Sequence, residues 1–468
     1  MGELLWLAGK AFLIALILTP IIRDISRSFN VVDRPGQRKV HAYPMPRVGG
    51  ISIAIAYGLA LFSVAGSGDS LSTAIHPAWK LIPGAAIVFL TGLIDDFFTL
   101  KPVFKLCGQV AGASVVFWSG LRMGGLADHP LSVWLDYPVT VFWLLLTCNA
   151  LNLIDGLDGL CAGMGLLATL TLFAAAILHG NYPLAYVTLP LAGALLGFLC
   201  YNINPATVFL GDSGALLIGF LLGCYGMIWT QRASTLLSIL VPLLALSIPL
   251  LDVSLSVLRR LLRHQPIFVA DKGHIHHRLL DRGLSPRQAV WVLYLVAALA
   301  AAFALLAGSP IGGRYQGLII VVFCGVALVG IRQLRYAEFD IAGRLLFRGE
   351  FQRAMDVRLR LTRAESALEQ ATTDEKWWEA LAQSARTLEL GAIRWTSERG
   401  TREERVMPGV APAWSFRIPL SETDSVEVEG TLQAPSAVAF DLVGFAEMIN
   451  RTFPGKRAPA GVPAAVVP

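Results

Sequence analysis

The sequence predicts an all-α polytopic membrane protein with about eleven transmembrane helices and a small C-terminal cytoplasmic α+β domain. Two observations predict this class. Hydrophobic residues make up 55% of the 468 residues and charged residues only 15%, a balance that excludes an ordinary soluble protein. The apolar residues gather in long runs as far as residue 334, and from Arg335 the composition becomes charged and mixed.

Eleven apolar runs are long enough to cross a bilayer. They cover about residues 4–22, 48–66, 80–94, 103–120, 133–152, 160–179, 183–201, 209–229, 235–258, 288–307 and 315–334. The first run lacks a small-residue cleavage signal, so we expect a retained span and not a removed signal peptide. The six cysteines lie in or beside the runs without paired spacing, which indicates buried thiols and neither a disulfide framework nor a zinc site.

Basic residues concentrate in the loops after the first and ninth runs, and such residues are retained on the cytoplasmic side. Loops of the opposite parity hold at most two of them. The N-terminus is therefore predicted outside and the C-terminus inside, with the ends of spans three, five, seven and nine at the cytoplasmic face. The basic residues are Arg23, Arg27, Arg34, Arg38, Lys39 and Arg47 in one loop, and Arg259, Arg260, Arg263, Lys272, Arg278, Arg282 and Arg287 in the other.

We divide the chain into a membrane domain (1–335), a helical linker (336–373), a small α+β domain (374–453) and a disordered tail (454–468). Apolar residues of the linker follow a 4-3-4-3 spacing from Val357 to Ala371, which predicts either a short coiled coil or an amphipathic helix that packs on its own domain. The α+β domain is expected to contain a helix at 375–390, strands at 392–396, 414–420 and 426–433, and a helix at 438–453.

The stretch from Asn149 to Leu160 reads NALNLIDGLDGL and follows the fifth run. Asn149, Asn152, Asp155 and Asp158 recur every third residue, so on a helical turn they lie along one side and can converge on one ligand. Carboxylates at the margin of a span are costly unless they face water, a metal or a partner. Helix capping would need only one or two such residues, so the pattern favours a functional site.

Two further acidic clusters border other runs. Asp95 and Asp96 are adjacent at the end of the third run, where two carboxylates repel each other, so we expect a compensating cation. That cation is either Mg²⁺ held by oxygen ligands or the side chains of Lys101 and Lys105. Asp212 lies between two glycines at the start of the eighth run, where it serves either as a helix N-cap or as part of the same site.

The loop after the ninth run contains three histidines, His274, His276 and His277. Three histidines within four residues suggest a transition metal, but Lys272 and Arg278 make the loop cationic and better suited to phosphate oxygens. A merely solvated basic loop is the alternative.

Together, these clusters offer acids for Mg²⁺ and cations for phosphates at one membrane face, which is the equipment for phosphoryl transfer between a soluble donor and a lipid acceptor. No Walker-type loop is present in the sequence, which argues against an ATP-driven pump. The competing hypothesis is a secondary transporter of a phosphorylated or nucleotide-sugar solute. Transporters place such groups near the bilayer midplane in repeated halves, whereas here they border the spans and no internal repeat is found.

The motifs of residues 1–335 resemble, in content and order, those of the polyprenyl-phosphate N-acetylhexosamine-1-phosphate transferases. The resemblance rests on DRPGQRKVHAYPMPRVGG at residues 33–50, the Asp-Asp pair, NALNLIDGLDGL, FLGDSG and HIHHRLLDRGLSPRQ. It implies transfer of a sugar 1-phosphate from a UDP-sugar to undecaprenyl phosphate, with release of UMP and with Mg²⁺ or Mn²⁺ as cofactor. The His-Ile-His-His order is similar to the N-acetylglucosamine branch, so N-acetylglucosamine 1-phosphate is the expected group.

The resemblance also implies roles for single residues. Asn152 and Asp212 resemble the metal ligands, and Asp158 resembles the residue that reads uracil. Three carboxylates are expected in the catalytic group, one of the first two activating the lipid phosphate: Asp95, Asp96 and Asp155. Contacts to the nucleotide, sugar and phosphates are expected from Asn149, Lys105, His274, His276, His277 and Arg278.

The implied location is the bacterial inner membrane, where the UDP-sugar and undecaprenyl phosphate meet in the first membrane step of a surface polysaccharide such as O-antigen. Membrane lipid is the other expected partner, no nucleic acid is expected, and a homodimer is compatible with the sequence. The C-terminal domain lies outside the family's common core. A regulatory or dimerisation module is one hypothesis for residues 335–468.

Overall fold

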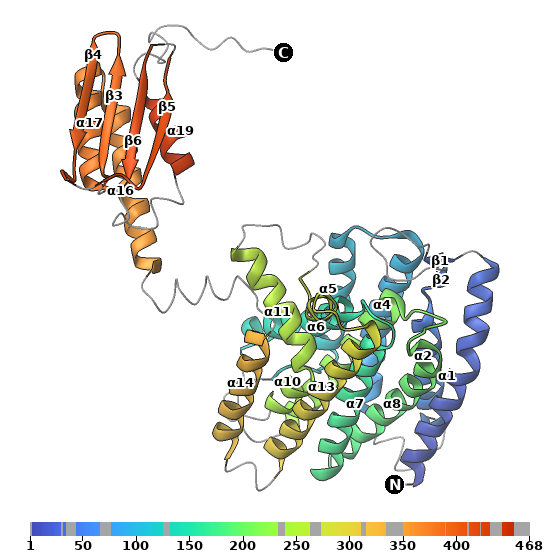
Figure 1. Cartoon of the computed structure of the whole chain (residues 1–468). Coiled ribbons are helices and arrows are strands. Elements are labelled where there is room, and N and C mark those ends of the chain that lie inside the picture. Colours follow the sequence, from blue (N-terminus) through green and yellow to red (C-terminus); the bar gives the residue numbers. More distant parts are fainter. Residues whose placement is uncertain are drawn as a thin grey trace. The chain divides into compact units, whose positions relative to one another are not determined.

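The computed structural model describes residues 2–29, 31–33, 44–65, 76–124, 132–232, 239–262, 273–309, 315–333, 350–388, 390–409, 411–421, 423–430 and 442–453. The chain forms two compact units, residues 1–335 and 336–468. The first, called the membrane unit, is a bundle of helices, and the second, called the C-terminal unit, is a sheet with helices (Figure 1). The predicted disordered tail at 454–468 lies outside the described residues.

The membrane unit is built mainly from helices. Its elements are α1 (Gly2–Ser28), β1 (Val32–Asp33), β2 (Met45–Pro46), α2 (Gly49–Ala65), α4 (His76–Phe98), α5 (Pro102–Trp118), α6 (Val133–Ile154), α7 (Leu160–Leu178), α8 (Tyr182–Asn202), α9 (Gly211–Arg232), α10 (Leu240–Ala245), α11 (Ser247–Leu262), α12 (Ile275–Asp281), α13 (Pro286–Gly308) and α14 (Gln316–Gln333). Strands β1 and β2 form an antiparallel pair.

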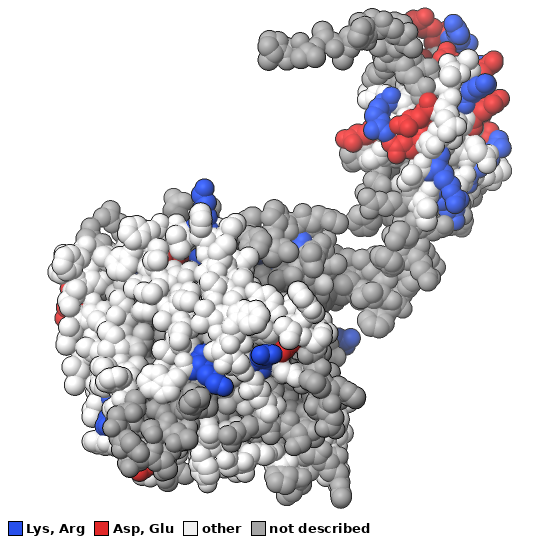
Figure 2. Space-filling view, turned by 180° about the vertical axis from the view of Figure 1, so that it is seen from behind, with Lys and Arg blue, Asp and Glu red and all other residues white. Residues whose placement is uncertain are grey.

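Seven of the helices in the described ranges are long and apolar enough to cross a membrane, and α2, α5 and α14 contain shorter apolar stretches. Each of the eleven predicted runs coincides with at least part of a helix, but eleven crossings are not confirmed. The outward face seen in Figure 2 is almost free of charged side chains over the membrane unit, whereas the C-terminal unit carries both signs. The membrane unit is therefore a multi-pass membrane structure.

The predicted ninth span, 235–258, is not one continuous helix. It is broken at Leu246 between α10 and α11. Pro249 explains the break, because its ring lacks an N–H and clashes with the carbonyl four residues earlier, at the end of α10. The prediction of a single helix there was wrong.

Helix α9 lies at the centre of the membrane unit. In its most apolar stretch 94% of the residues are buried, and it packs against α2, α4, α6, α7 and α8. Glycines allow close approach of α4: a Cβ added at Gly92 would lie 2.6 Å from Cα of Ser213 and 2.7 Å from the carbonyl oxygen of Asp212. The start of α9 is therefore pressed directly against the backbone of α4.

Replacing Gly92 with Ala is expected to lower the free energy of unfolding by about 1–3 kcal/mol, because overpacking forces the two backbones apart. Thermal unfolding of the purified variant in detergent measures this effect. The control is Gly58→Ala in α2, where an added Cβ meets nothing within 4 Å. Equal unfolding temperatures for the two variants would contradict the close packing of α4 on α9.

The C-terminal unit is a four-stranded antiparallel sheet in the order β4-β3-β6-β5. Ile393 and Val428 on one face of the sheet share a buried core with the helices, which contribute residues such as Trp377 of α17. The prediction of three strands missed β4, which is exposed at every position except Glu404 and is highly charged. The elements are α16 (Glu350–Gln370), α17 (Asp374–Thr387), β3 (Ala392–Ser397), β4 (Gly400–Arg405), β5 (Trp414–Pro419), β6 (Ser425–Gly430) and α19 (Leu442–Thr452).

The 4-3-4-3 stripe of the predicted linker lies on α16, apart from Ala371, which directly follows the helix. Ala364, Leu368 and Ala371 are buried in the core of the C-terminal unit. This packing corresponds to the amphipathic helix on its own domain, the second of the two predicted arrangements. The side chain of Val357 lies outside the described ones.

Candidate active site

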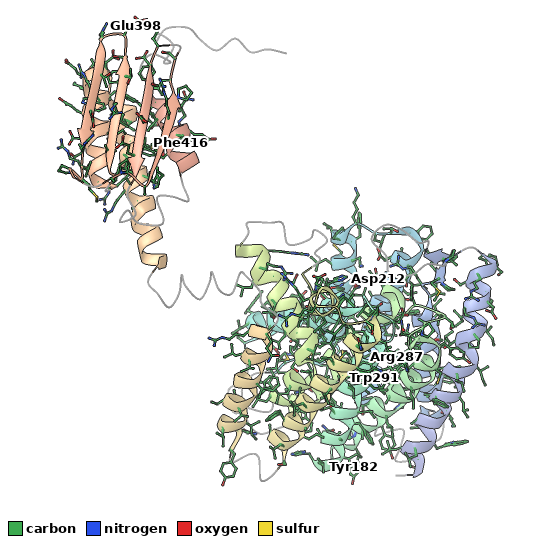
Figure 3. All side chains as sticks on the ribbon, viewed as in Figure 1. Tyr182, Asp212, Arg287, Trp291, Glu398 and Phe416 are labelled. Atoms are coloured by element: carbon green, nitrogen blue, oxygen red, sulfur yellow. The ribbon has the colours of Figure 1, made fainter. Side chains whose placement is uncertain are left out.

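The predicted acidic residues meet at one end of the membrane unit, where α4 and α6 end and α9 begins. Asp95 and Asp96 lie in the last turn of α4, Asn152 in the last turn of α6, and Asp212 in the first turn of α9. Asp212 is at this end of the bundle and Tyr182, the first residue of α8, is at the opposite end (Figure 3). Residues from three helices thus share one end of the bundle.

Lys105 of α5 bridges two of these carboxylates. Its Nζ donates to Oδ2 of Asp212 over 2.6 Å and lies 3.0 Å from Oδ2 of Asp95. The side chains are 22%, 18% and 9% exposed, respectively, so water screens these charges less than on an open surface. Of the two lysines proposed as counter-cations for the acidic pair, Lys105 makes the contact.

Asp96 is bound to the start of α9. Its Oδ1 accepts a hydrogen bond from the amide of Asp212 over 2.8 Å, and its Oδ2 accepts one from the amide of Ser213 over 3.0 Å. A carboxylate is favoured there because the first amides of a helix lack partners within the helix and carry partial positive charge. Asp96 therefore fixes the position of Asp212.

Asp95 is oriented differently from its neighbour. Its Oδ1 accepts from the amide of Leu100 over 2.5 Å, in the turn after α4 where Thr99 has a φ of +49°. Its Oδ2 faces Lys105. Within the acidic pair, Asp95 thus presents an oxygen to a cation, whereas both oxygens of Asp96 bind backbone amides.

Asn152 completes the contacts of Asp212, because its Nδ2 donates to Oδ1 of Asp212 over 3.1 Å. No group of three His, Cys, Asp or Glu side chains with the arrangement of a metal site is found in the described ranges. The donor set nevertheless fits a divalent cation of the Mg²⁺ type, since it consists of carboxylate and amide oxygens. Between Asp95 and Asp212 there is already a position for positive charge, which Lys105 holds.

Asp155 forms the C-cap of α6, where its amide donates to the carbonyl of Asn152 over 3.3 Å. The next residue, Gly156, lies under the ring of His276, and a Cβ added there would be 2.5 Å from its Nε2. His276 is only 2% exposed, and its Nδ1 has no hydrogen-bond partner in the part of the chain that the structure describes. The turn after α6 and the histidine segment, residues 273–278, are thus in contact.

Burial, together with the negative charges of Asp212 and Asp96, raises the pKa of Asp155 to about 8. Burial and the neighbouring His277 lower the pKa of His276 to about 4. At pH 7 and without ligands, Asp155 is therefore protonated and His276 is neutral. His276 offers one donor and one acceptor in this state, and no positive charge.

Infrared difference spectroscopy of the purified protein, free of divalent cations, is expected to show a protonated carboxyl group that ionises near pH 8. The sign follows from the raised pKa: the protonated form is present below pH 8 and is lost as the pH rises through that value. The band is assigned with Asp155→Asn, which should lack it. A wild-type protein without such a band at pH 6 would contradict the raised pKa of Asp155.

Asn149 and Asp158, the outer members of the every-third-residue pattern, contact other elements. The Nδ2 of Asn149 donates to Oε1 of Gln109 on α5 over 2.8 Å and to the carbonyl of Leu145. Oδ2 of Asp158 accepts from Nδ2 of Asn204 over 3.0 Å and from the amide of Ala206 over 3.1 Å. Asn149 thus joins α6 to α5, and Asp158 joins the turn after α6 to the loop before α9.

The histidine segment is anchored on α11. Nδ1 of His274 lies 2.9 Å from Oδ2 of Asp252, and the ring of His277 packs 4.3 Å from that of His276. Arg278 lies in α12, and its amide donates to the carbonyl of His274. The three predicted histidines therefore form one group of neighbouring rings.

Sequence reasoning missed two residues that hold this end of the unit together. Asp252 anchors His274, and Asn202 accepts from the amide of Gly159 over 3.2 Å and donates to the carbonyl of Val208 over 2.9 Å. A signal for Asp252 was present, since a single carboxylate inside an apolar run usually marks a functional site. No comparable signal marks Asn202.

Comparison with known proteins gives a consistent result. Residues 78–230 match the model of glycosyl transferase family 4. A probable undecaprenyl-phosphate N-acetylglucosaminyl 1-phosphate transferase of Bacillus subtilis is 36% identical over 291 residues, which cover 61% of this chain and 80% of the relative.

Two further relatives carry related names. A decaprenyl-phosphate N-acetylglucosaminephosphotransferase of Mycolicibacterium smegmatis is 34% identical over 365 residues, or 70% of this chain and 88% of the relative. An undecaprenyl-phosphate alpha-N-acetylglucosaminyl 1-phosphate transferase of Escherichia coli K12 is 27% identical over 310 residues, or 63% and 82%. The similarity covers most of each relative.

Proposed function

Because the chain belongs to glycosyl transferase family 4, we propose that it transfers N-acetylglucosamine 1-phosphate from a UDP-sugar to undecaprenyl phosphate and releases UMP. The protein is a membrane phosphotransferase with a polyprenyl phosphate acceptor, in agreement with its relatives. The product is the first lipid-linked sugar of a surface polysaccharide.

One observation carries the assignment of the site: Nζ of Lys105 on α5 lies 3.0 Å from Oδ2 of Asp95 on α4 and 2.6 Å from Oδ2 of Asp212 on α9. Asn152 extends the cluster to a fourth helix. Phosphoryl transfer depends on positioning and on neutralising charge. A lysine that can bind diphosphate oxygens and oxygen ligands that can hold a metal ion meet this need.

In the proposed reaction, an oxygen of the lipid phosphate attacks the phosphorus that bears the sugar. A new P–O bond forms to that phosphorus while the bond to the UMP oxygen breaks, so UMP leaves with the electron pair. Asp95 takes the proton of the lipid phosphate when that phosphate binds as a monoanion. Lys105 turns from the carboxylates to the diphosphate oxygens, where its ammonium shields negative charge.

Mg²⁺ or Mn²⁺, held by Asp212 and Asn152, would supply charge neutralisation on the diphosphate. Asp96 keeps Asp212 in place through the backbone amides of α9. Asp155 and the histidine segment would line the donor side of the site, with Asp158 toward the base. These assignments are supported by the position of the residues, which all lie at the same end of the helix bundle.

The site is proposed to face the cytoplasm of a bacterial inner membrane, with the N-terminus outside. Arg23 and Arg27 end α1, and Arg259 and Arg260 lie in the last turn of α11, whereas Lys80 lies near the start of α4. The more basic side is retained in the cytoplasm, where a soluble nucleotide sugar is available.

The test is UMP release by the purified full chain in detergent with undecaprenyl phosphate. UDP-N-acetylglucosamine, its C4 epimer and 6-deoxy relatives are compared, each with and without Mg²⁺. Release that depends on both the metal and one donor would establish the reaction and the sugar together.

No release with any donor, from folded protein that binds undecaprenyl phosphate, would contradict the proposal. The transporter hypothesis would then return, and uptake of labelled UDP-sugar into proteoliposomes would test it. The present contacts do not favour transport, because the cluster lies at helix ends and not at the middle of the spans.

A further inference from the structure

Asp252 is a buried carboxylate to which the proposed reaction assigns no part. It lies on α11 and is 1% exposed. Its Oδ2 lies 2.9 Å from Nδ1 of His274, and its Oδ1 accepts from the amide of Ile275 over 2.7 Å. Both oxygens therefore hold successive residues of the histidine segment. A carboxylate in a largely apolar helix is costly unless it is compensated in this way.

A second residue on the same face of α11, Arg259, holds the same segment and also contacts Ser256. Ser256 and Arg259 follow Asp252 at four and seven positions, so all three side chains lie on one side of the helix. Arg259 is 5% exposed, and its Nη1 donates to the carbonyl of Gly273 over 3.0 Å. An acceptor and a donor from one helix face thus fix the backbone and the first ring of the segment.

The contact with Asp252 determines which nitrogen of His274 carries the proton. In a neutral imidazole whose Nδ1 donates to a carboxylate, Nε2 is left as the acceptor. The ring then lies parallel to that of His276, with 5.7 Å between centroids and 4° between planes. His276 in turn covers Gly156, beside Asp155.

We propose that Asp252 is a positioning residue of the transfer reaction, which fixes His274 in the tautomer protonated on Nδ1 and presents Nε2 toward the substrate. Asp252 itself touches no substrate and acts through His274. This inference rests on the proposed function, in which the histidine segment contacts the donor.

Two substitutions separate the hydrogen-bonding role of Asp252 from its size. Asp252→Asn keeps the shape and can accept from Ile275, but its amide can donate to Nδ1 and so favours the other tautomer of His274. We expect kcat/KM to fall about 10- to 100-fold, the usual cost of losing an orienting partner. Asp252→Glu keeps an acceptor-only carboxylate and is expected to retain more activity than Asp252→Asn.

A double-mutant cycle tests whether Asp252 acts through His274. UMP release is measured for Asp252→Asn, His274→Gln and the double variant. We expect the double variant to release UMP as fast as His274→Gln alone. Losses that multiply would overturn the proposal, because Asp252 would then act independently. Asp136→Asn is the matched control, since Asp136 is also buried but contacts Gly124 and Thr140.

The tautomer itself gives a measurement that does not depend on activity. Nitrogen-15 NMR of labelled histidine in the wild-type protein, assigned by comparison with His274→Gln, should show the His274 proton on Nδ1. A proton on Nε2 would overturn the proposal even if Asp252→Asn failed to fold. A wild-type protein that releases no UMP would contradict the proposed function alone, because the tautomer is read without substrate.

Discussion

Replacing Asp212 with Asn is expected to lower UMP release by roughly a thousandfold, as expected for removal of a group that stabilises charge in the reaction. The substitution keeps the size of the side chain but removes the negative charge that pairs with Lys105 over 2.6 Å. The fold should persist, because Lys105 retains Asp95 as a partner and the backbone amide of residue 212 still binds Asp96.

The measurement is the initial rate of UMP release at saturating UDP-sugar and undecaprenyl phosphate. Asp136→Asn serves as the control, because this carboxylate is buried at the other end of α6, where it accepts hydrogen bonds from Thr140 and from the amide of Gly124. The control should keep most of its activity. Normal turnover by Asp212→Asn would remove Asp212 from the site.

Substitutions of Asp95 and Asp96 are expected to differ in their effects on activity and stability. Asp95→Asn should lower activity by about 10²- to 10⁴-fold, the range for loss of a general base, with little change in stability. Asp96→Asn should lower activity and also the free energy of unfolding, by about 1–3 kcal/mol, because an amide cannot accept from both Asp212 and Ser213 through two oxygens.

Thermal unfolding and UMP release of both variants in the same detergent distinguish the two roles. The geometry predicts a clear difference in unfolding temperature and similar losses of activity. If Asp95→Asn were the less stable protein, or the more active one by the margin expected for loss of a base, the roles of the two residues would have to be exchanged.

The helical class was predictable because a bilayer imposes long apolar runs on any chain that crosses it. The sixth run, predicted at 160–179, corresponds to α7 at Leu160–Leu178. The tenth, predicted at 288–307, lies within α13 at Pro286–Gly308. Boundaries agree well here because the ends of both runs carry polar or glycine residues that end an apolar helix.

The clustering of Asp95, Asn152 and Asp212 follows from the alternation of span direction, which needs only the order of the runs. Which oxygen faces which partner does not follow from that order. Asp95 and Asp96 are adjacent on α4 and so point in directions about 100° apart. Which of them faces the start of α9 depends on how closely α9 packs at Gly92. Packing of this kind brings together residues that no local pattern connects.

The sequence did not predict strand β4 or the role of Asp252, and the two omissions have different causes. Strand β4 is exposed and charged, so it lacks the alternation that marks a half-buried strand, and only its pairing with β3 makes it a strand. Asp252 lies within an apolar run, and the hydrophobicity of that run predicts only a membrane span. Its partner His274 is 22 residues later in the chain, beyond the reach of helical or strand periodicity.

The contact between Asp96 and the amide of Asp212 joins residues that are 116 positions apart in the chain. At ribosomal rates of about 5–20 residues per second, the carboxylate is synthesised roughly 6–23 s before the amide that binds it. During that interval the acidic pair has neither α9 nor its helix terminus, although Lys105 is already available. The order of synthesis therefore leaves this end of the bundle incomplete until its central helix arrives, so a chain interrupted before residue 212 contains most of the acidic groups and none of the assembled site.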